Sequence, residues 1–80
     1  MNDEATRAEV RRVLALVLGP QVAGASEIRR DSAPAWDSLK HVEILFAVED
    51  RFGVRFAEDE LRSLASDEDI ARAVERHLAA

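Results

Sequence analysis

The chain contains no cysteine, which excludes a disulfide framework, a thiolate metal site and a cysteine nucleophile. No apolar run approaches the roughly 18 residues that a membrane-spanning helix needs, and no signal-peptide pattern opens the chain. We therefore expect a cytoplasmic protein that does not bind a membrane.

Basic residues are also scarce, with 11 Lys and Arg against 16 Asp and Glu and a net charge of −5. The imbalance is local: residues 1–36 hold five charges of each sign, whereas residues 37–80 hold eleven acidic and six basic residues. Nucleic acids require a basic surface, so we expect no nucleic-acid partner. The acidity favours protein partners with a basic surface, although acidity that only improves solubility would give the same count.

No segment alternates apolar and polar residues as a strand would, and there is no repeat or low-complexity tract. The 80 residues, 48% hydrophobic and 34% charged, suit one folded domain over residues 1–80. We expect an all-α fold, a small four-helix bundle of three main helices and one short helix. The expected helices cover about residues 3–18, 38–52, 57–64 and 67 to the C-terminus.

Capping residues support these boundaries. Asn2 and Asp3 are N-cap candidates for the first helix, and Gly53 is expected to close the second. Ser66 is expected to cap the last helix, with Asp69 as a partner of the capping-box type.

A long connection, residues 19–36, joins the first two helices. Connections of this length are unusual in small domains and are often functional. We expect a short helical turn near residues 25–30, with Val22 and Ile28 packing against the bundle. Pro34 disfavours helix at the preceding residue, so a new element should begin just beyond it.

The helix over residues 38–52 carries two apolar stripes when residues are placed at about 100° intervals. One stripe is the expected core face and contains Ile44, Leu45, Val48 and Phe52. The other contains Leu39, Val42 and Phe46, flanked and interleaved by the acidic residues Glu43, Glu49 and Asp50. Because one buried stripe suffices for such a helix, the second is either covered by the long connection or exposed as a partner-binding surface.

Ser38 stands where the polar connection meets this helix. Asp37 or Ser38 can serve as the N-cap, which leaves the other without a capping role. Serine catalysis needs a base within reach, but His41 is expected to project toward the core, and no Gly-x-Ser-x-Gly motif is present. The two histidines match no metal-ligand spacing. We therefore interpret Ser38 as an attachment point, not a catalyst, because a helix N-terminus favours a phosphate ester.

Three segments carry a family resemblance: Asp37-Ser38-Leu39, Val42-Glu43 and Glu49-Asp50-Arg51-Phe52-Gly53-Val54. Together they resemble the signature of acyl carrier proteins, and Trp36-Asp37-Ser38-Leu39 resembles the form found in many stand-alone carriers. The resemblance implies that Ser38 carries 4′-phosphopantetheine, transferred from coenzyme A by a phosphopantetheinyl transferase with magnesium, and that acyl groups are held on it as thioesters. It implies that Asp37 assists recognition or orientation at the modification site. It also implies partner docking through Leu39, Val42, Glu43, Phe46, Glu49 and Asp50.

The implied protein is a non-catalytic carrier, which we expect to be stand-alone, and a monomer is the default expectation. Its implied partners are the transferase and acyl-loading and acyl-transferring enzymes, such as a ligase, an acyltransferase or a ketosynthase. Three positions depart from the family pattern: Ala35 replaces a frequent glycine, Lys40 followed by His41 replaces an acidic or polar residue, and Asp67 replaces an apolar one. The altered charge beside Ser38 and the arginine-rich first helix favour polyketide or other natural-product assembly over primary fatty acid biosynthesis.

Other interpretations stay open. An aminoacyl or peptidyl carrier would usually show a Gly-Gly-[His/Asp]-Ser motif, which is absent. An unmodified helical interaction module would use Ser38 only as a cap, and a small hydrolase would need a base for it. Trp36 either packs on the bundle as a lid for the connection or lies beside the prosthetic arm, and the acyl group is not specified.

Overall fold

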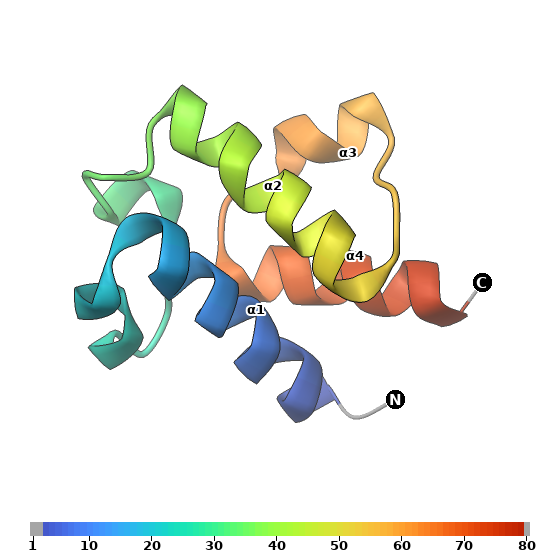
Figure 1. The fold of residues 1–80 in the computed structure, drawn as a ribbon, viewed down its shortest axis with the longest axis horizontal. Helices are drawn as coiled ribbons and strands as arrows, with labels where there is room; N and C mark the ends of the chain where they lie inside the picture. The colour runs from blue at the N-terminus through green and yellow to red at the C-terminus, as the bar shows by residue number, and fades with distance from the viewer. Residues whose placement is uncertain (1–2, 80) are drawn as a thin grey trace.

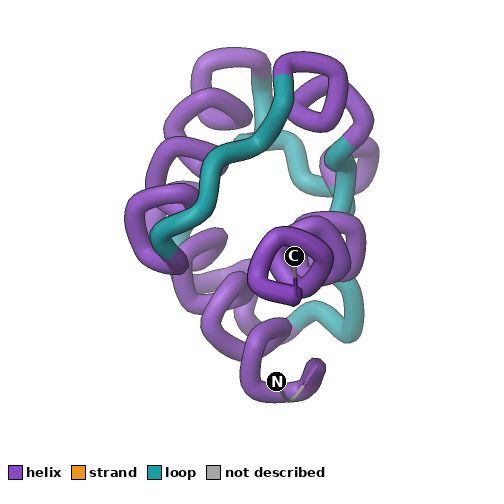
Figure 2. The backbone as a smooth tube through the Cα atoms, turned by 90° about the vertical axis from the view of Figure 1, so that its right-hand side faces the viewer, coloured by secondary structure: helices purple, strands orange, loops and turns teal. Residues whose placement is uncertain are grey.

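Four α-helices and two short 3-10 helices make up the fold of residues 3–79, the part of the chain that the computed structural model describes (Figure 1). Asn2, one of the expected N-cap residues, lies outside this range. Within it the backbone consists of helices and loops without a strand (Figure 2), which confirms the all-α four-helix prediction. The elements are α1 (Asp3–Leu18), η1 (Pro20–Gly24), η2 (Arg30–Ser32), α2 (Ser38–Phe52), α3 (Glu58–Ser63) and α4 (Asp67–Ala79).

Helix α1 packs against both α2 and α4 and supplies one side of the core. Val10, Val13, Leu14 and Leu18 are buried on the inner face of this helix, and Val17 is partly buried. The helix ends before Gly19, whose φ of 115° breaks the helical path. The buried apolar residues form one cluster that draws on every long helix and the connection: Val10, Val13, Leu14, Leu18, Ile28, Trp36, Ile44, Leu45, Val48, Phe56, Leu64, Ile70, Ala71, Ala73 and Val74.

Helix α2 turns its predicted core face inward. Ile44, Leu45 and Val48 are buried, and Phe52 packs against the same cluster while remaining partly exposed. The helix ends at Gly53, which adopts the left-handed conformation with φ of 67° and donates its backbone N–H to the carbonyl of Glu49. This C-cap confirms the predicted boundary.

Replacing Gly53 with alanine should lower the free energy of unfolding by about 1 kcal/mol, because a Cβ atom disfavours the left-handed conformation. A Cβ added there would meet no atom within 4 Å, so the cost arises from the backbone alone. Gly24→Ala is the matched control, since that site is equally open and has no positive φ. Chemical denaturation of both variants checks the prediction, and equal stability of the two would contradict it.

The connection between α1 and α2 is fastened by Asp67, at the start of α4. The backbone N–H of Ile28 donates to Asp67 Oδ1 at 3.3 Å, and the Ile28 carbonyl accepts from the N–H of Asp67 at 2.9 Å. On α1, Arg11 Nη1 and Arg7 Nε donate to Asp67 Oδ2 at 2.7 and 3.2 Å. The same two guanidinium groups also donate to carbonyls of the connection, those of Ala23, Ala25 and Ser26. Asp67 and the two arginines of the first helix therefore act together to hold the connection against the helices.

The helical turn expected near residues 25–30 is wrong. The connection instead forms η1 before that segment and η2 at its end. Pro20 starts η1, where a fixed φ and a missing N–H are tolerated. Residues 25–27 bend instead, and Ile28 and Arg29 then run beside the start of α4, because Ile28 is bonded to Asp67 and Arg29 forms an antiparallel bridge with Ser66. Burial of Ile28 and partial burial of Val22 confirm that these two residues pack on the bundle.

The short α3 and the start of α4 are set by local caps. Ala57, expected within the third helix, is its N-cap, and its N–H donates to Glu60 Oε1 at 2.8 Å. That bond and one from the ring of His77 hold the pKa of Glu60 below its ordinary value. Ser66 Oγ accepts from the N–H of Asp69 at 3.1 Å, which confirms the predicted cap. The Asp69 carboxylate in turn accepts the backbone N–H of Ala65, one residue before the cap, at 3.1 Å.

Across residues 3–79, none of the helices combines the length and the apolar character needed to cross a membrane.

Candidate functional site

Ser38 is the first residue of α2, and its side chain is exposed. The preceding Asp37 is the N-cap, because its Oδ1 accepts the backbone N–H of Lys40 at 2.9 Å. This resolves which of the two residues caps the helix. Among the described residues, the Ser38 hydroxyl has no hydrogen-bond partner. The Ser38 hydroxyl is therefore accessible, and no hydrogen bond within residues 3–79 has to break before it can react.

His41 is the histidine nearest to Ser38 in the sequence, and it faces the core as predicted. Its side chain is buried, and its ring nitrogens contact Trp36 Nε1 at 3.0 Å and the carbonyl oxygen of Leu61 at 2.7 Å. Neither nitrogen is free to take a proton from Ser38. The geometry therefore offers no support for a serine nucleophile paired with His41.

The second apolar stripe of α2 is exposed, not covered by the connection. Leu39, Val42 and Phe46 keep 68%, 47% and 61% of their surface accessible. We call these three residues the α2 stripe. It begins at the residue after Ser38 and continues along the same helix, so a partner that reaches Ser38 along α2 would also meet apolar side chains.

The acidic residues around the α2 stripe are placed differently from one another. Glu43 is exposed and forms an ion pair with Lys40 at 3.5 Å. Asp50 is exposed and lines an open groove with Phe46. Glu49 is partly buried, and its Oε2 accepts the backbone N–H of Phe56 at 2.8 Å. The carboxylate of Glu49 therefore also fastens the segment between α2 and α3.

Trp36 packs on the bundle, which answers the question that the sequence left open. The indole is only 3% exposed and belongs to the core cluster. Its ring stacks on that of His41, with centroids 6.0 Å apart and an interplanar angle of 28°. Sequence reasoning missed this pairing. The sequence did contain a signal for the pairing: Trp36 comes just before the helix, and the first core-facing residue of that helix is His41.

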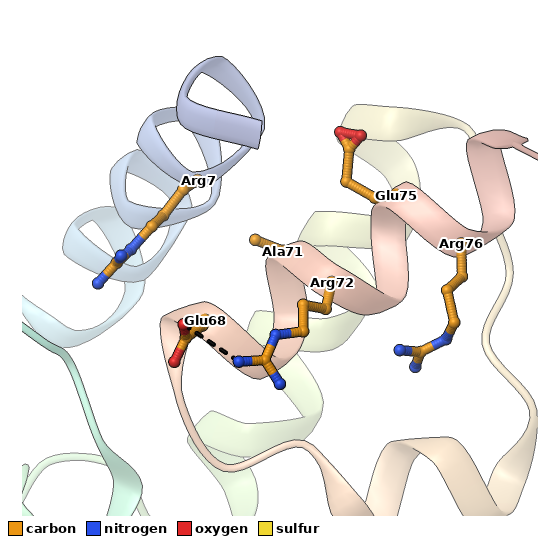
Figure 3. A pocket seen from close by; sticks show the side chains of 6 residues that line it. All are labelled: Arg7, Glu68, Ala71, Arg72, Glu75 and Arg76. Atoms are coloured by element: carbon orange, nitrogen blue, oxygen red, sulfur yellow. Dashed lines mark ion pairs between the residues drawn. The ribbon is translucent and has the colours of Figure 1, made fainter. Parts of the chain in front are cut away.

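A second groove lies between α1 and α4 (Figure 3). Sequence reasoning did not single it out. Its charged side chains are paired: Arg72 lies 3.2 Å from Glu68, and the Glu75 carboxylate accepts from Thr6 at 2.7 Å. No residue of α2 lines it, so it is not part of the Ser38 site. The lining residues are Arg7, Glu68, Ala71, Arg72, Glu75 and Arg76.

Comparison of the chain with protein-family models, with curated proteins and with solved structures yields no match. The Ser38 site combines an uncommitted serine hydroxyl, an aspartate cap and an exposed apolar stripe on one helix.

Proposed function

We propose that this chain is an acyl carrier protein and that Ser38 is the attachment point of 4′-phosphopantetheine. The observation that supports this most is the exposed Ser38 hydroxyl, without a hydrogen-bond partner among the described residues, at the start of the helix that carries the α2 stripe. A serine kept only for capping would direct its hydroxyl to a backbone N–H, and here Asp37 has that role.

The residues present fit the prosthetic group. A phosphodiester on Ser38 would lie at the positive end of α2, where the helix dipole favours an anion. The exposure of Ser38 leaves room for a long arm. When bound, the group supplies a terminal thiol that holds acyl groups as thioesters.

This chain's part in the attachment reaction is to present an oriented nucleophile. The Ser38 oxygen loses its proton and forms a bond to phosphorus, while the pyrophosphate bond of coenzyme A breaks and adenosine 3′,5′-bisphosphate leaves. The transferase and its magnesium supply the activation. Asp37 fixes the first turn of α2 through the N–H of Lys40 and so sets the direction of the Ser38 side chain.

The α2 stripe is the proposed docking surface for the transferase and for the ligase, acyltransferase or ketosynthase that loads or receives the acyl group. An apolar centre with a charged rim is typical of protein interfaces. Glu43 and Asp50 would attract basic partner surfaces, and Glu49 contributes to the rim while it holds the Phe56 backbone. A cytoplasmic carrier in polyketide or other natural-product biosynthesis is the setting that we propose.

Intact-mass analysis after incubation with coenzyme A and a broad-specificity phosphopantetheinyl transferase tests the proposal. We expect the purified chain to gain one phosphopantetheine and Ser38→Ala to gain none. Ser32→Ala is a matched control, because this serine is also exposed but lies in η2, and it should be modified normally. A folded native chain that gains no mass beside a known carrier would refute the proposal and leave the α2 stripe as the surface of an unmodified interaction module.

A further inference from the structure

The segment before Ser38 is anchored by one buried side chain. Trp36 is 3% exposed, whereas Ala35, Asp37 and Ser38 are all exposed. The backbone N–H of Trp36 donates to the Ala33 carbonyl at 2.9 Å, and that of Asp37 donates to the Ala35 carbonyl at 3.0 Å. The chain that leads into Ser38 is therefore held by these backbone hydrogen bonds and by the buried indole of Trp36.

His41 holds that indole with one ring nitrogen and helix α3 with the other. An indole N–H can only donate, so His41 Nδ1 must accept from Trp36 Nε1 across their 3.0 Å contact. The proton of the neutral ring then lies on Nε2, which donates to the Leu61 carbonyl at 2.7 Å. This relay of two hydrogen bonds joins the connection, α2 and α3 through His41, one helical turn after Ser38.

We propose that His41 is a positioning residue for the modification of Ser38, acting through the indole of Trp36; this inference rests on the proposed carrier function. His41 does not touch the Ser38 hydroxyl in this arrangement. Through the indole, His41 fixes the backbone at Trp36, two residues before the serine. The Asp37 cap fixes the first turn of α2, which follows the serine. Small displacements of a nucleophile reduce the rate of the chemical step strongly, with about a hundredfold loss for 1 Å.

Two amide substitutions separate the arms of the relay. In His41→Asn the amide oxygen replaces Nδ1 and can still accept from Trp36. In His41→Gln the amide nitrogen replaces Nε2, so the bond to Leu61 can remain while the acceptor for the indole is lost. Trp36→Phe removes the indole N–H and keeps a buried aromatic ring. Because loss of a buried hydrogen bond also lowers stability, the variants are compared by the kcat and KM of chains that circular dichroism shows to be folded.

Steady-state kinetics with the unmodified carrier as varied substrate of the transferase test the proposal. We expect His41→Gln and Trp36→Phe to lower kcat about tenfold with KM within about twofold. His41→Asn should lose less than about threefold in kcat. His77→Gln is the matched control, since this second histidine pairs with Glu60 and packs edge-on against Phe56, and it should retain the native kcat.

The emission of Trp36 supplies a readout that does not depend on modification, because it is the only tryptophan in the chain. Its emission maximum should shift in His41→Gln and stay near the native value in His41→Asn. If the native chain is modified but His41→Gln and Trp36→Phe keep native kcat, or if His41→Asn falls as far as His41→Gln, the positioning role is wrong and the carrier function stands. If the native chain is not modified at all, the carrier function is refuted and the positioning role with it.

Discussion

Replacing Asp67 with alanine should lower the free energy of unfolding by about 3 kcal/mol, the largest loss of stability that we expect from a single polar side chain here. The carboxylate is fully buried and takes hydrogen bonds from Arg7, Arg11 and the backbone N–H of Ile28. An 80-residue domain has a total stability of roughly 4–12 kcal/mol, so this loss removes a large share. The midpoint of thermal unfolding should fall by on the order of 15 °C.

The size of the effect follows from what Asp67 leaves behind. Removing one partner of a buried ion pair costs roughly 3–5 kcal/mol when the other charge stays buried. Here the side chains of Arg7 and Arg11 keep 40% and 21% of their surface accessible, so they can regain some hydration. The N–H of Ile28 has no such route, because this residue is buried. We therefore expect a value at the lower end of the range, with loosening of the connection as its structural sign.

Thermal and chemical denaturation of a matched pair checks this prediction. Arg12→Ala removes another charge from α1, but that side chain is 70% exposed and lies 4.0 Å from Glu9, so the change should stay within about 0.5 kcal/mol. A loss below about 1 kcal/mol for Asp67→Ala would show that the carboxylate does not fasten the connection.

The contribution of Asp67 should also depend on pH. Burial raises the pKa of Asp67, but the hydrogen bonds from Arg11, the Ile28 N–H and Arg7 outweigh it, so the pKa lies below its ordinary value. A carboxyl with a lowered folded pKa stabilises the fold fully above its unfolded pKa, about 3.9, and loses this contribution as the pH falls through the folded pKa. The stability difference between the native chain and Asp67→Asn should therefore shrink below about pH 4. A difference that grows with acidification would contradict the sign.

Local sequence patterns were enough to predict the helices and the position of Ser38. The period of apolar residues on α1 and α2 reports directly which face is buried, and Gly53 marks the end of α2 because few residues tolerate its conformation. Angular placement also separated the α2 stripe from the core face. It could not decide whether the stripe is covered, because that depends on the path of the connection.

Interactions between distant segments were not predictable in the same way. Asp67 stood out as an unusual residue, but nothing local shows that Arg7 and Arg11, some 60 residues earlier, reach it. The pair Trp36 and His41 is close in sequence, yet its geometry depends on a turn at the helix start and on α3 behind it. Side-chain partners of this kind follow from tertiary packing. The spacing of apolar residues along a single helix shows which face is buried but not which distant side chains meet there.

The second large effect concerns docking: Phe46→Ala should raise the KM of the carrier for the transferase about thirtyfold, corresponding to about 2 kcal/mol. Phe46 is the largest side chain of the α2 stripe and is 61% exposed, so it suits the aromatic anchor of an interface. Alanine is preferable to a charged residue, since a new carboxylate could be attracted to a basic partner. Steady-state kinetics should show the change in KM with kcat nearly preserved, the reverse of the pattern expected for His41→Gln.

Leu16→Ala provides the matched control for Phe46→Ala. Leu16 is 81% exposed on α1. The Leu16→Ala substitution therefore removes a comparable exposed apolar side chain outside the α2 stripe. Both variants should keep native helical content by circular dichroism, because neither side chain is buried. If Leu16→Ala raises KM as much as Phe46→Ala, partners do not select the α2 stripe. If Phe46→Ala instead unfolds the domain, Phe46 contributes to the core. A large KM effect confined to Phe46, in a folded chain, would place the partner's contact on the helix that Ser38 opens.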